Sequence, residues 1–406
     1  MEFQSFTLQN GIRVVHGRTS SHVAYCSMMV NAGTRDEFEN EHGIAHFIEH
    51  VIFKGTKRRK AYHIMSRLED VGGELNAYTS KEETVVHATF LKEDFHRAVE
   101  LLFDIMFRST FPEKELKKEK EVILDEINSY KDSPSELIFD DFEELVYPNH
   151  PIGRNILGTK KHLKRFTKTD IINFMERNYN TDQMVFCSMG NIPFNRVVKL
   201  AERYFGSIPS NPRKVSRIPV IDSPPDFKEV KKNTYQRHCI VGSRAFDLKH
   251  PNRIGMYLLN NILGGPGQNS RLNLALRERS GFAYNVESSY TPYSDTGLFS
   301  IYFGTDKANF QKSLDLLYDE LKQIRSVKLG VQQLGKAKRQ LMGQLAISAE
   351  NSESLMLNVA RSFLFFNTFD GLDEVYTRIE SISALELMDI ANEILLPANL
   401  STLIYR

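Results

Sequence analysis

The two halves of this chain repeat one order of secondary-structure patterns, and this repeat constrains the fold more strongly than any other feature. In each half a strand pattern is followed by an amphipathic helix pattern, a second strand pattern and a long helix pattern. The sequence predicts these elements at residues 23–30, 43–53, 84–91 and 95–107, and again at 237–243, 253–263, 297–303 and 310–324. We therefore expect two distantly related α/β domains of about 200 residues each.

A proline-rich stretch lies between the two halves. Its prolines fall within residues 209–225, where they interrupt any regular helix or strand. We therefore predict a first domain at residues 1–212, a linker at 213–225 and a second domain at 226–406. The length of 406 residues agrees with this division, because it exceeds what one ordinary hydrophobic core accommodates.

The composition is that of a soluble globular protein, with 41% hydrophobic and 25% charged residues. The net charge of +1 gives no support to nucleic acid or an anionic membrane surface as a partner. No apolar run reaches the length of a membrane span, and the chain starts with a strand pattern rather than a signal or transit peptide. Three widely spaced cysteines fit neither a disulfide framework nor a metal motif. We therefore expect a cytoplasmic protein.

The predicted helix at residues 43–53 carries the motif His46-x-x-Glu49-His50. Two histidines four residues apart share one helix face, so they can supply two ligands of a tetrahedral zinc site. Glu49 borders the same face and can act as a base on a metal-bound water. The alternative is a helix that carries two histidines by chance, so the interpretation needs a third ligand.

A second amphipathic helix, at residues 113–127, offers that ligand. Its predicted apolar stripe consists of Leu116, Val122, Ile123 and Ile127. Glu119 and Glu126 lie seven residues apart, which is two helical turns, and so fall on nearly the same face. A charged helix normally presents such residues to solvent, so the pattern alone favours surface positions for Glu115, Glu119 and Glu121.

Together, His46-x-x-Glu49-His50 and the later pair Glu119 and Glu126 resemble the zinc site of the pitrilysin superfamily. This superfamily includes insulin-degrading enzyme, mitochondrial processing peptidase and half-length bacterial processing-type peptidases. The resemblance implies that one zinc ion per chain is bound by His46, His50 and Glu126. It also implies that Glu49 is the general base and that Glu119 orients a ligand or the water.

Two further segments of the first half match the superfamily. Residues 72–80 resemble its active-site edge strand, which binds the backbone of an extended substrate peptide by strand addition. The residues implied in this role are Asn76, Ala77, Tyr78 and Thr79. Without the resemblance, an ordinary strand entered through a Gly-Gly turn is the favoured interpretation. Residues 151–158 resemble the loop that follows the ligand helix.

The second half resembles the superfamily's domain without metal. Residues 264–284 match its signature, and the resemblance implies that Arg277 and Tyr284 reach the active site from this half. Alignment of the halves places residues without metal-binding side chains opposite the ligands, namely Met256 opposite His46, Asn260 opposite His50 and Gln344 opposite Glu126. The second half is thus expected to keep the architecture and lose the metal.

The resemblance also implies an α+β fold class with two tandem homologous α/β sandwich domains. Each domain would have a mixed sheet with helices packed against one face. The chain has half the length of the four-domain clamshell of long superfamily members, and half-length members pair to complete the shell. We therefore expect a homodimer whose catalytic cleft combines the first domain of one chain with the second domain of the other.

These features predict a zinc-dependent endopeptidase that hydrolyses unfolded peptides or short polypeptides inside a dimeric chamber. An alternative from another class is a non-catalytic or substrate-binding subunit of a processing-peptidase-like heterodimer. The complete ligand set and the Arg277/Tyr284 pair in one chain favour the self-sufficient homodimer. Zinc chemistry other than proteolysis is a third possibility that nothing in the sequence requires.

Overall fold

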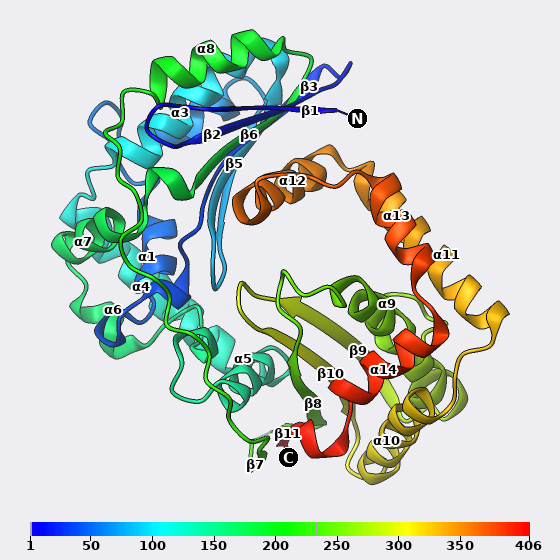
Figure 1. The fold of residues 1–406 in the computed structure, drawn as a ribbon. Coiled ribbons are helices and arrows are strands. Elements are labelled where there is room, and N and C mark those ends of the chain that lie inside the picture. Colours follow the sequence, from blue (N-terminus) through cyan, green and yellow to red (C-terminus); the bar gives the residue numbers. More distant parts are fainter. Residues whose placement is uncertain (1, 233) are drawn as a thin grey trace. The chain divides into compact units, whose positions relative to one another are not determined.

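The computed structural model describes residues 2–232 and 234–406, which form two compact units with one β-sheet each. The first unit contains residues up to 128, 154–218 and 347–371, and the second contains 129–153, 219–346 and 372–406. Each unit therefore takes one helix-bearing segment from the other half of the sequence (Figure 1).

The first sheet is mixed and six-stranded, with the order β1-β2-β6-β3-β5-β4. Only the β2–β6 pair is parallel among the pairings of this sheet. β4 lies at one edge. The strands are β1 (Phe3–Thr7), β2 (Arg13–Arg18), β3 (Val23–Val30), β4 (Glu74–Thr79), β5 (Thr84–Leu91) and β6 (Met184–Gly190).

The second sheet has the order β7-β11-β8-β10-β9, with β7 and β11 parallel and the other neighbours antiparallel. This order and these directions match β2-β6-β3-β5-β4 of the first sheet, so the repeat predicted from the sequence is present in the topology. The strands are β7 (Phe227–Val230), β8 (Arg237–Ala245), β9 (Ala283–Pro292), β10 (Gly297–Thr305) and β11 (Ser401–Tyr405).

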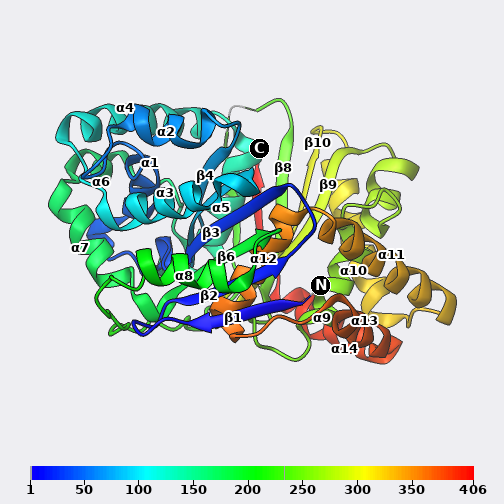
Figure 2. The ribbon, with the colours of Figure 1, turned by 90° about the horizontal axis from the view of Figure 1, so that it is seen from above.

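A layer of helices covers one face of the first sheet, and Figure 2 shows α1, α2 and α3 (blue to cyan) beside α7 and α8 (green). The helices of this unit are α1 (Ile44–Val51), α2 (Ala61–Glu69), α3 (Phe95–Arg108), α4 (Glu113–Lys131), α6 (Lys160–Arg165), α7 (Lys168–Asn178) and α8 (Phe194–Tyr204). The predicted helices at 43–53, 95–107 and 113–127 are thereby confirmed as α1, α3 and α4.

The second unit has its own helix layer, formed by α9 (Arg253–Gly264), α10 (Phe310–Ser326), α11 (Val331–Ala349), α13 (Leu372–Ser381) and α14 (Ala384–Ile394). α9 and α10 confirm the predicted helices at 253–263 and 310–324. The fold class is therefore α+β with two mixed sheets covered by helices, as expected. Among the described residues, no helix combines the length and apolar composition needed to cross a membrane.

Besides the expected helix layer on one face, each sheet is also covered by a helix on its second face. On the first sheet, the second face (Val15, Met29, Val85, Val185 and Cys187) packs against α12 (Ser352–Phe366), which comes from the second half of the chain. Every residue of β6 is buried, so this strand requires an apolar partner on both sides. Figure 1 shows α12 in orange within the unit that also holds the blue strands.

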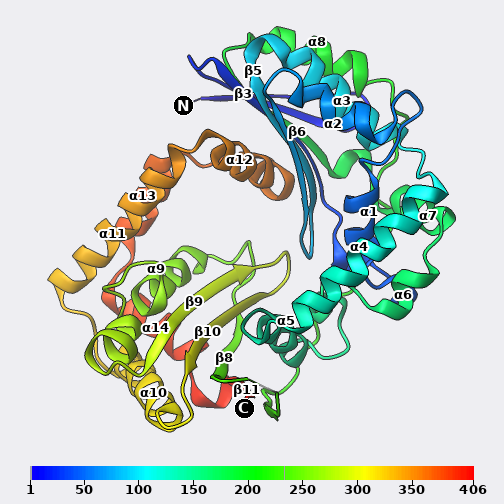
Figure 3. The same ribbon diagram turned by 180° about the vertical axis from the view of Figure 1, so that it is seen from behind.

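The reciprocal exchange covers the second sheet. α5 (Pro134–Val146), from the first half, packs Ile138 and Phe142 against a cluster that includes Ile240, Tyr302 and Leu403. Figure 3 shows this teal helix beside β8 and β11. The two halves thus exchange equivalent helices, a feature that hydrophobic periodicity could not predict because it does not identify which sheet a helix covers.

The proline-rich segment has no helix or strand in residues 205–226, as its composition predicts. Its first part is nevertheless held on the first unit. Asp36 forms ion pairs with Arg213 at 2.6 Å and with Arg217 at 2.9 Å, and Arg217 also pairs with Glu82 at 3.2 Å. The boundaries at 212 and 226 stay a prediction.

Met356 tests the helix exchange, because it is a fully buried residue of α12 that lies in the second half of the sequence. Met356→Ala should destabilise the protein by about 2–5 kcal/mol, since it leaves a cavity under the sheet. Hydrogen exchange followed by mass spectrometry should show faster exchange in β3 and β6 of the first unit. The exposed neighbour Asn358 supplies the control, Asn358→Ala, and faster exchange confined to β8 and β10 would contradict the packing of α12.

Candidate functional site

α1, which carries the histidine motif, starts at a buried backbone contact. Gly43, its N-terminal cap, has φ of +96°, a left-handed conformation that favours glycine. A Cβ atom on Gly43 would lie 2.7 Å from the Cα of Gly158, so the two glycines allow the loop at 151–158 to touch the helix start. This contact gives a structural role to a loop that the sequence matched only by resemblance.

Glu37 caps the same helix end. Its two carboxylate oxygens accept hydrogen bonds from the backbone N–H groups of Gly43 at 2.9 Å and Ala45 at 3.0 Å. Burial raises the pKa of Glu37 to about 8, while these two hydrogen bonds act in the opposite direction. Sequence reasoning missed Glu37, because its distance of six to eight residues from its partners matches no standard capping pattern.

α1 buries its apolar face in the core and turns both motif histidines toward α4. The rings of His46 and His50 lie 4.7 Å apart between centroids. His46 is buried with a 7% exposed fraction, whereas His50 is partly exposed. The spacing of four residues therefore does bring the two imidazoles together, as predicted.

Glu126 of α4 lies opposite both histidines. Its carboxylate oxygens are 3.8 Å from Nε2 of His46 and 3.5 Å from Nε2 of His50, too far for direct hydrogen bonds. Ligand atoms about 2.0–2.1 Å from a tetrahedral zinc ion are separated by roughly 3.3 Å, so these gaps fit a shared ion. Among the described residues, these three form the one group of His, Cys, Asp or Glu side chains close enough to hold a metal.

The protonation state of His46 also fits a metal ligand. Burial, with a smaller contribution from neighbouring His50, lowers the pKa of His46 to about 3. The imidazole is therefore neutral near pH 7, as metal binding requires. Its buried Nδ1 atom has no hydrogen-bond partner within the described part of the chain, while Nε2 points at Glu126.

Glu119 lies in the interior beside His50 and not in the solvated position that the helix pattern alone favours, while its orienting role, implied by the resemblance, stays a prediction. Its exposed fraction is 8%, and Leu116, Ile123 and Ile127 are buried on the same side of α4. Val122, predicted in the apolar stripe, is 50% exposed instead, because one residue step from Ile123 turns it by about 100° around the helix. Periodicity alone could not separate the buried glutamate from its solvated neighbours.

Glu49 faces a cavity of about 300 Å³ beside the cluster. Burial raises the pKa of its carboxyl group, and interactions with Thr79 at the end of β4 oppose this rise. The cavity is lined by Glu49, His50, Phe53, Lys54, Met65, Glu69, Leu75, Asn76, Ala77 and Glu119. The predicted base and the edge strand β4 therefore meet at one recess.

The four predicted edge-strand residues are divided in the structure. Asn76 and Ala77 line the cavity. Tyr78 instead packs with the apolar cluster beneath α12, and its ring lies 6.3 Å from that of His87. Thr79 adjoins Glu49. Their predicted contacts with a substrate stay a prediction.

Arg277 and Tyr284 belong to the second unit. Arg277 lies on a π-helical turn (Asn273–Arg279), and its Nε atom is 3.7 Å from a carboxylate oxygen of Glu278. Tyr284, on the edge strand β9, is 81% exposed. Both side chains are thus accessible, and their predicted role at the metal cluster stays a prediction.

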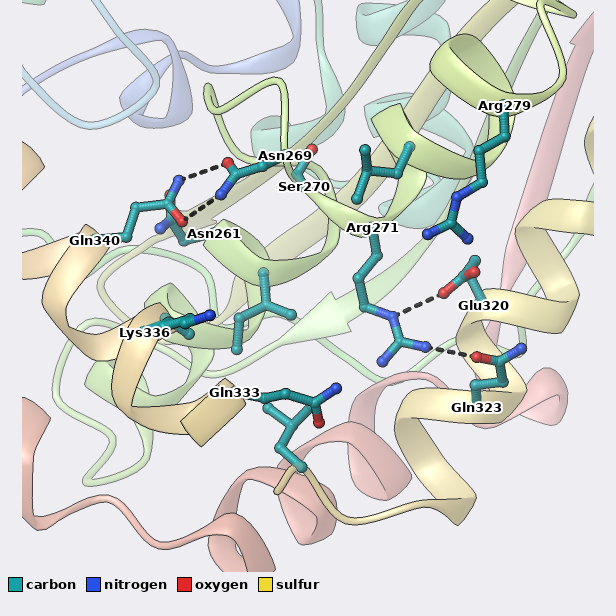
Figure 4. A pocket seen from close by; sticks show the side chains of 14 residues that line it. Asn261, Asn269, Ser270, Arg271, Arg279, Glu320, Gln323, Gln333, Lys336 and Gln340 are labelled. Carbon is teal, nitrogen blue, oxygen red and sulfur yellow. Dashed lines mark hydrogen bonds and ion pairs between the residues drawn. The ribbon is translucent and has the colours of Figure 1, made fainter. Parts of the chain in front are cut away.

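The second unit has a larger cavity of about 380 Å³, shown in Figure 4. Many of its polar side chains bind one another: Arg271 contacts Glu320 at 2.7 Å and Gln323 at 2.8 Å, and Asn269 pairs with Gln340. It contains neither histidine nor cysteine and no part of the metal cluster. Chemistry rather than volume therefore identifies the smaller cavity as the candidate active site.

Comparisons with known proteins identify the family of the chain. Residues 13–160 match the family model described as insulinase (peptidase family M16), and residues 165–341 match the model described as the peptidase M16 inactive domain. The chain is 32% identical over 394 residues to the uncharacterized zinc protease YmxG of Bacillus subtilis, covering 96% of this chain and 95% of that protein.

Two further relatives extend the comparison. The chain is 31% identical to the mitochondrial-processing peptidase subunit beta of Saccharomyces cerevisiae, covering 95% of this chain and 87% of that protein. A protease from Helicobacter pylori has the same fold, with a TM-score of 0.91, 21% identity and coverage of 100% of this chain and 99% of that one. The resemblance seen in the motifs is thus confirmed along nearly the whole sequence, and the chain belongs to peptidase family M16, the insulinase family.

Proposed function

We propose that this protein is a zinc-dependent endopeptidase that hydrolyses unfolded peptides or short polypeptides. One observation carries the proposal: Nε2 of both motif histidines faces the carboxylate of Glu126 at 3.5–3.8 Å, beside a cavity that Glu49 lines. Similar bacterial proteins are named zinc proteases, which supports the same activity here. His46, His50 and Glu126 would hold the ion.

A zinc ion bound there would lower the pKa of a bound water and polarise the scissile carbonyl group. Glu49 would accept the proton of that water and later donate it to the leaving amine. The burial that raises the pKa of Glu49 makes its carboxylate more basic and so suits it to this role. β4, with one edge unpaired in the sheet, would align an extended peptide along Asn76 and Ala77.

The substrate-binding subunit of a heterodimer is the alternative function. Members without activity are expected to lack part of the metal cluster, whereas this chain brings His46, His50, Glu126 and Glu49 together. We further propose a cytoplasmic homodimer in which Arg277 and Tyr284 of one chain supply hydrogen-bond donors to the substrate in the site of the other.

The metal assignment is tested by His50→Ala. The purified wild-type protein should contain one zinc ion per chain by elemental analysis, and the variant should lose it, because two of three ligands cannot hold the ion tightly. The exposed His22 provides the control, since His22→Ala should keep full zinc content. Full stoichiometric zinc in His50→Ala would contradict the assignment.

Glu49→Gln tests the general base. This variant should fold and keep zinc while its turnover falls by about 10²–10⁴-fold, since the amide cannot accept the proton. Activity is measured by digesting a peptide library, with and without a chelator, and identifying products by mass. Glu121→Gln, on the exposed side of α4, should leave turnover unchanged. Near-normal cleavage by Glu49→Gln would remove this residue from the mechanism.

Assembly is tested by mixing two inactive proteins, Glu49→Gln and the double variant Arg277→Ala/Tyr284→Phe, under conditions that allow subunit exchange. In a mixed dimer with sites completed between chains, one site inherits both defects and the other neither. About half of the dimers would be mixed, so roughly a quarter of wild-type activity should return. Demonstrated exchange without recovered activity would show that the pair acts within its own chain or not at all.

A further inference from the structure

Two glutamates of α4 each contact two side chains of residues 46–54, the segment formed by α1 and the residues that follow it. Glu126 lies between His46 and His50, and Glu119 lies between His50 and Lys54. The contacted residues His46, His50 and Lys54 are spaced by four, with Lys54 just beyond the end of α1, while the glutamates are spaced by seven in the reverse order. The two segments therefore run antiparallel and share His50 between two carboxylates.

Each oxygen of the Glu119 carboxylate has a different neighbour. Oε1 lies 2.9 Å from Nζ of Lys54, and Oε2 lies 3.4 Å from Nδ1 of His50. The exposed fractions of the Lys54 and Glu119 side chains are 27% and 11%. This ion pair is therefore partly shielded from water, unlike a typical surface pair.

Lys54 is the cation that holds the mostly buried Glu119 carboxylate in its position. Without the ammonium group beside Oε1, the Glu119 carboxylate would be free to turn toward the cavity that it lines. Such a turn would move Oε2 away from Nδ1 of His50. A metal-binding histidine relies on such a carboxylate at its second nitrogen to fix its ring orientation and tautomer.

We propose that Lys54 is a positioning residue of the metal site. It holds the carboxylate of Glu119 in place through Oε1, so that Oε2 stays beside Nδ1 of His50 and the ring presents Nε2 toward Glu126 and the metal position. Lys54 acts through Glu119 and not by contact with the ion. This inference rests on the proposed zinc-binding function, and nothing in the His-x-x-Glu-His motif predicts it.

The experiment measures zinc affinity of the metal-free protein by competition with a chromophoric chelator, so that it does not depend on activity. Lys54→Met removes the ammonium group and should weaken zinc binding by about 10–100-fold, the range seen when a ligand loses its orienting partner. Lys54→Gln provides a second neutral variant with a polar end, and Lys54→Arg should restore most of the affinity. Lys57→Met removes an exposed lysine three residues away and should change nothing.

A double-mutant cycle separates positioning from a general loss of structure. If Lys54 acts through Glu119, then Lys54→Met/Glu119→Gln should bind zinc no more weakly than Glu119→Gln alone. Unfolding curves of the metal-free variants check that each one folds.

Three results would overturn the proposal: wild-type zinc affinity in both Lys54→Met and Lys54→Gln, additive losses in the cycle, or a raised KM with unchanged zinc affinity. The last would indicate contact with substrate in the cavity that Lys54 lines. A wild-type protein that binds no zinc would instead disprove the proposed function, so the two failures are distinguishable.

Discussion

The approach of Glu126 on α4 to His46 and His50 on α1 is the contact on which the candidate site depends. It places imidazole nitrogens and carboxylate oxygens a few tenths of an ångström farther apart than hydrogen bonds allow. His46 is buried and its Nδ1 atom has no hydrogen-bond partner among the described residues, whereas the Glu126 side chain is 43% exposed. Other contacts of the first unit fix the positions of the two helices. Glu37 and the Gly43/Gly158 contact hold the start of α1, and the buried side chains of Ile123 and Ile127 hold α4 in the core.

Charge balance follows from the same contact. Glu49 of α1 and the two glutamates of α4, Glu119 and Glu126, gather three carboxyl groups around His46 and His50. Glu119 is the buried one of the three. A bound divalent cation together with Lys54 would carry three positive charges, which equals the charge of three carboxylates. The second unit has no metal ligands at the equivalent positions. Met256, which aligns with His46, is fully buried there and packs in the apolar core.

Much of the fold and the site could be predicted because the signals are local. Strands such as β3 and helices such as α3 follow from periodicity, and the spacing of His46 and His50 reflects helix geometry, whereas Glu126 is singled out only by the family resemblance. Glu37, Lys54 and the burial of Glu119 could not be predicted, because each depends on which residues a distant segment presents. The exposed Val122 shows the same limit, since apolar character does not reveal a helix's rotation about its axis.

The exchange of α5 and α12 gives the chain an order of assembly. During synthesis, all strands of the first sheet have been made once residue 190 is added. The helix that covers the second face of this sheet, Ser352–Phe366, is made much later. An apolar surface is thus exposed while more than a third of the protein is still being made. Each half of the sequence therefore lacks the helix that covers the second face of its own sheet.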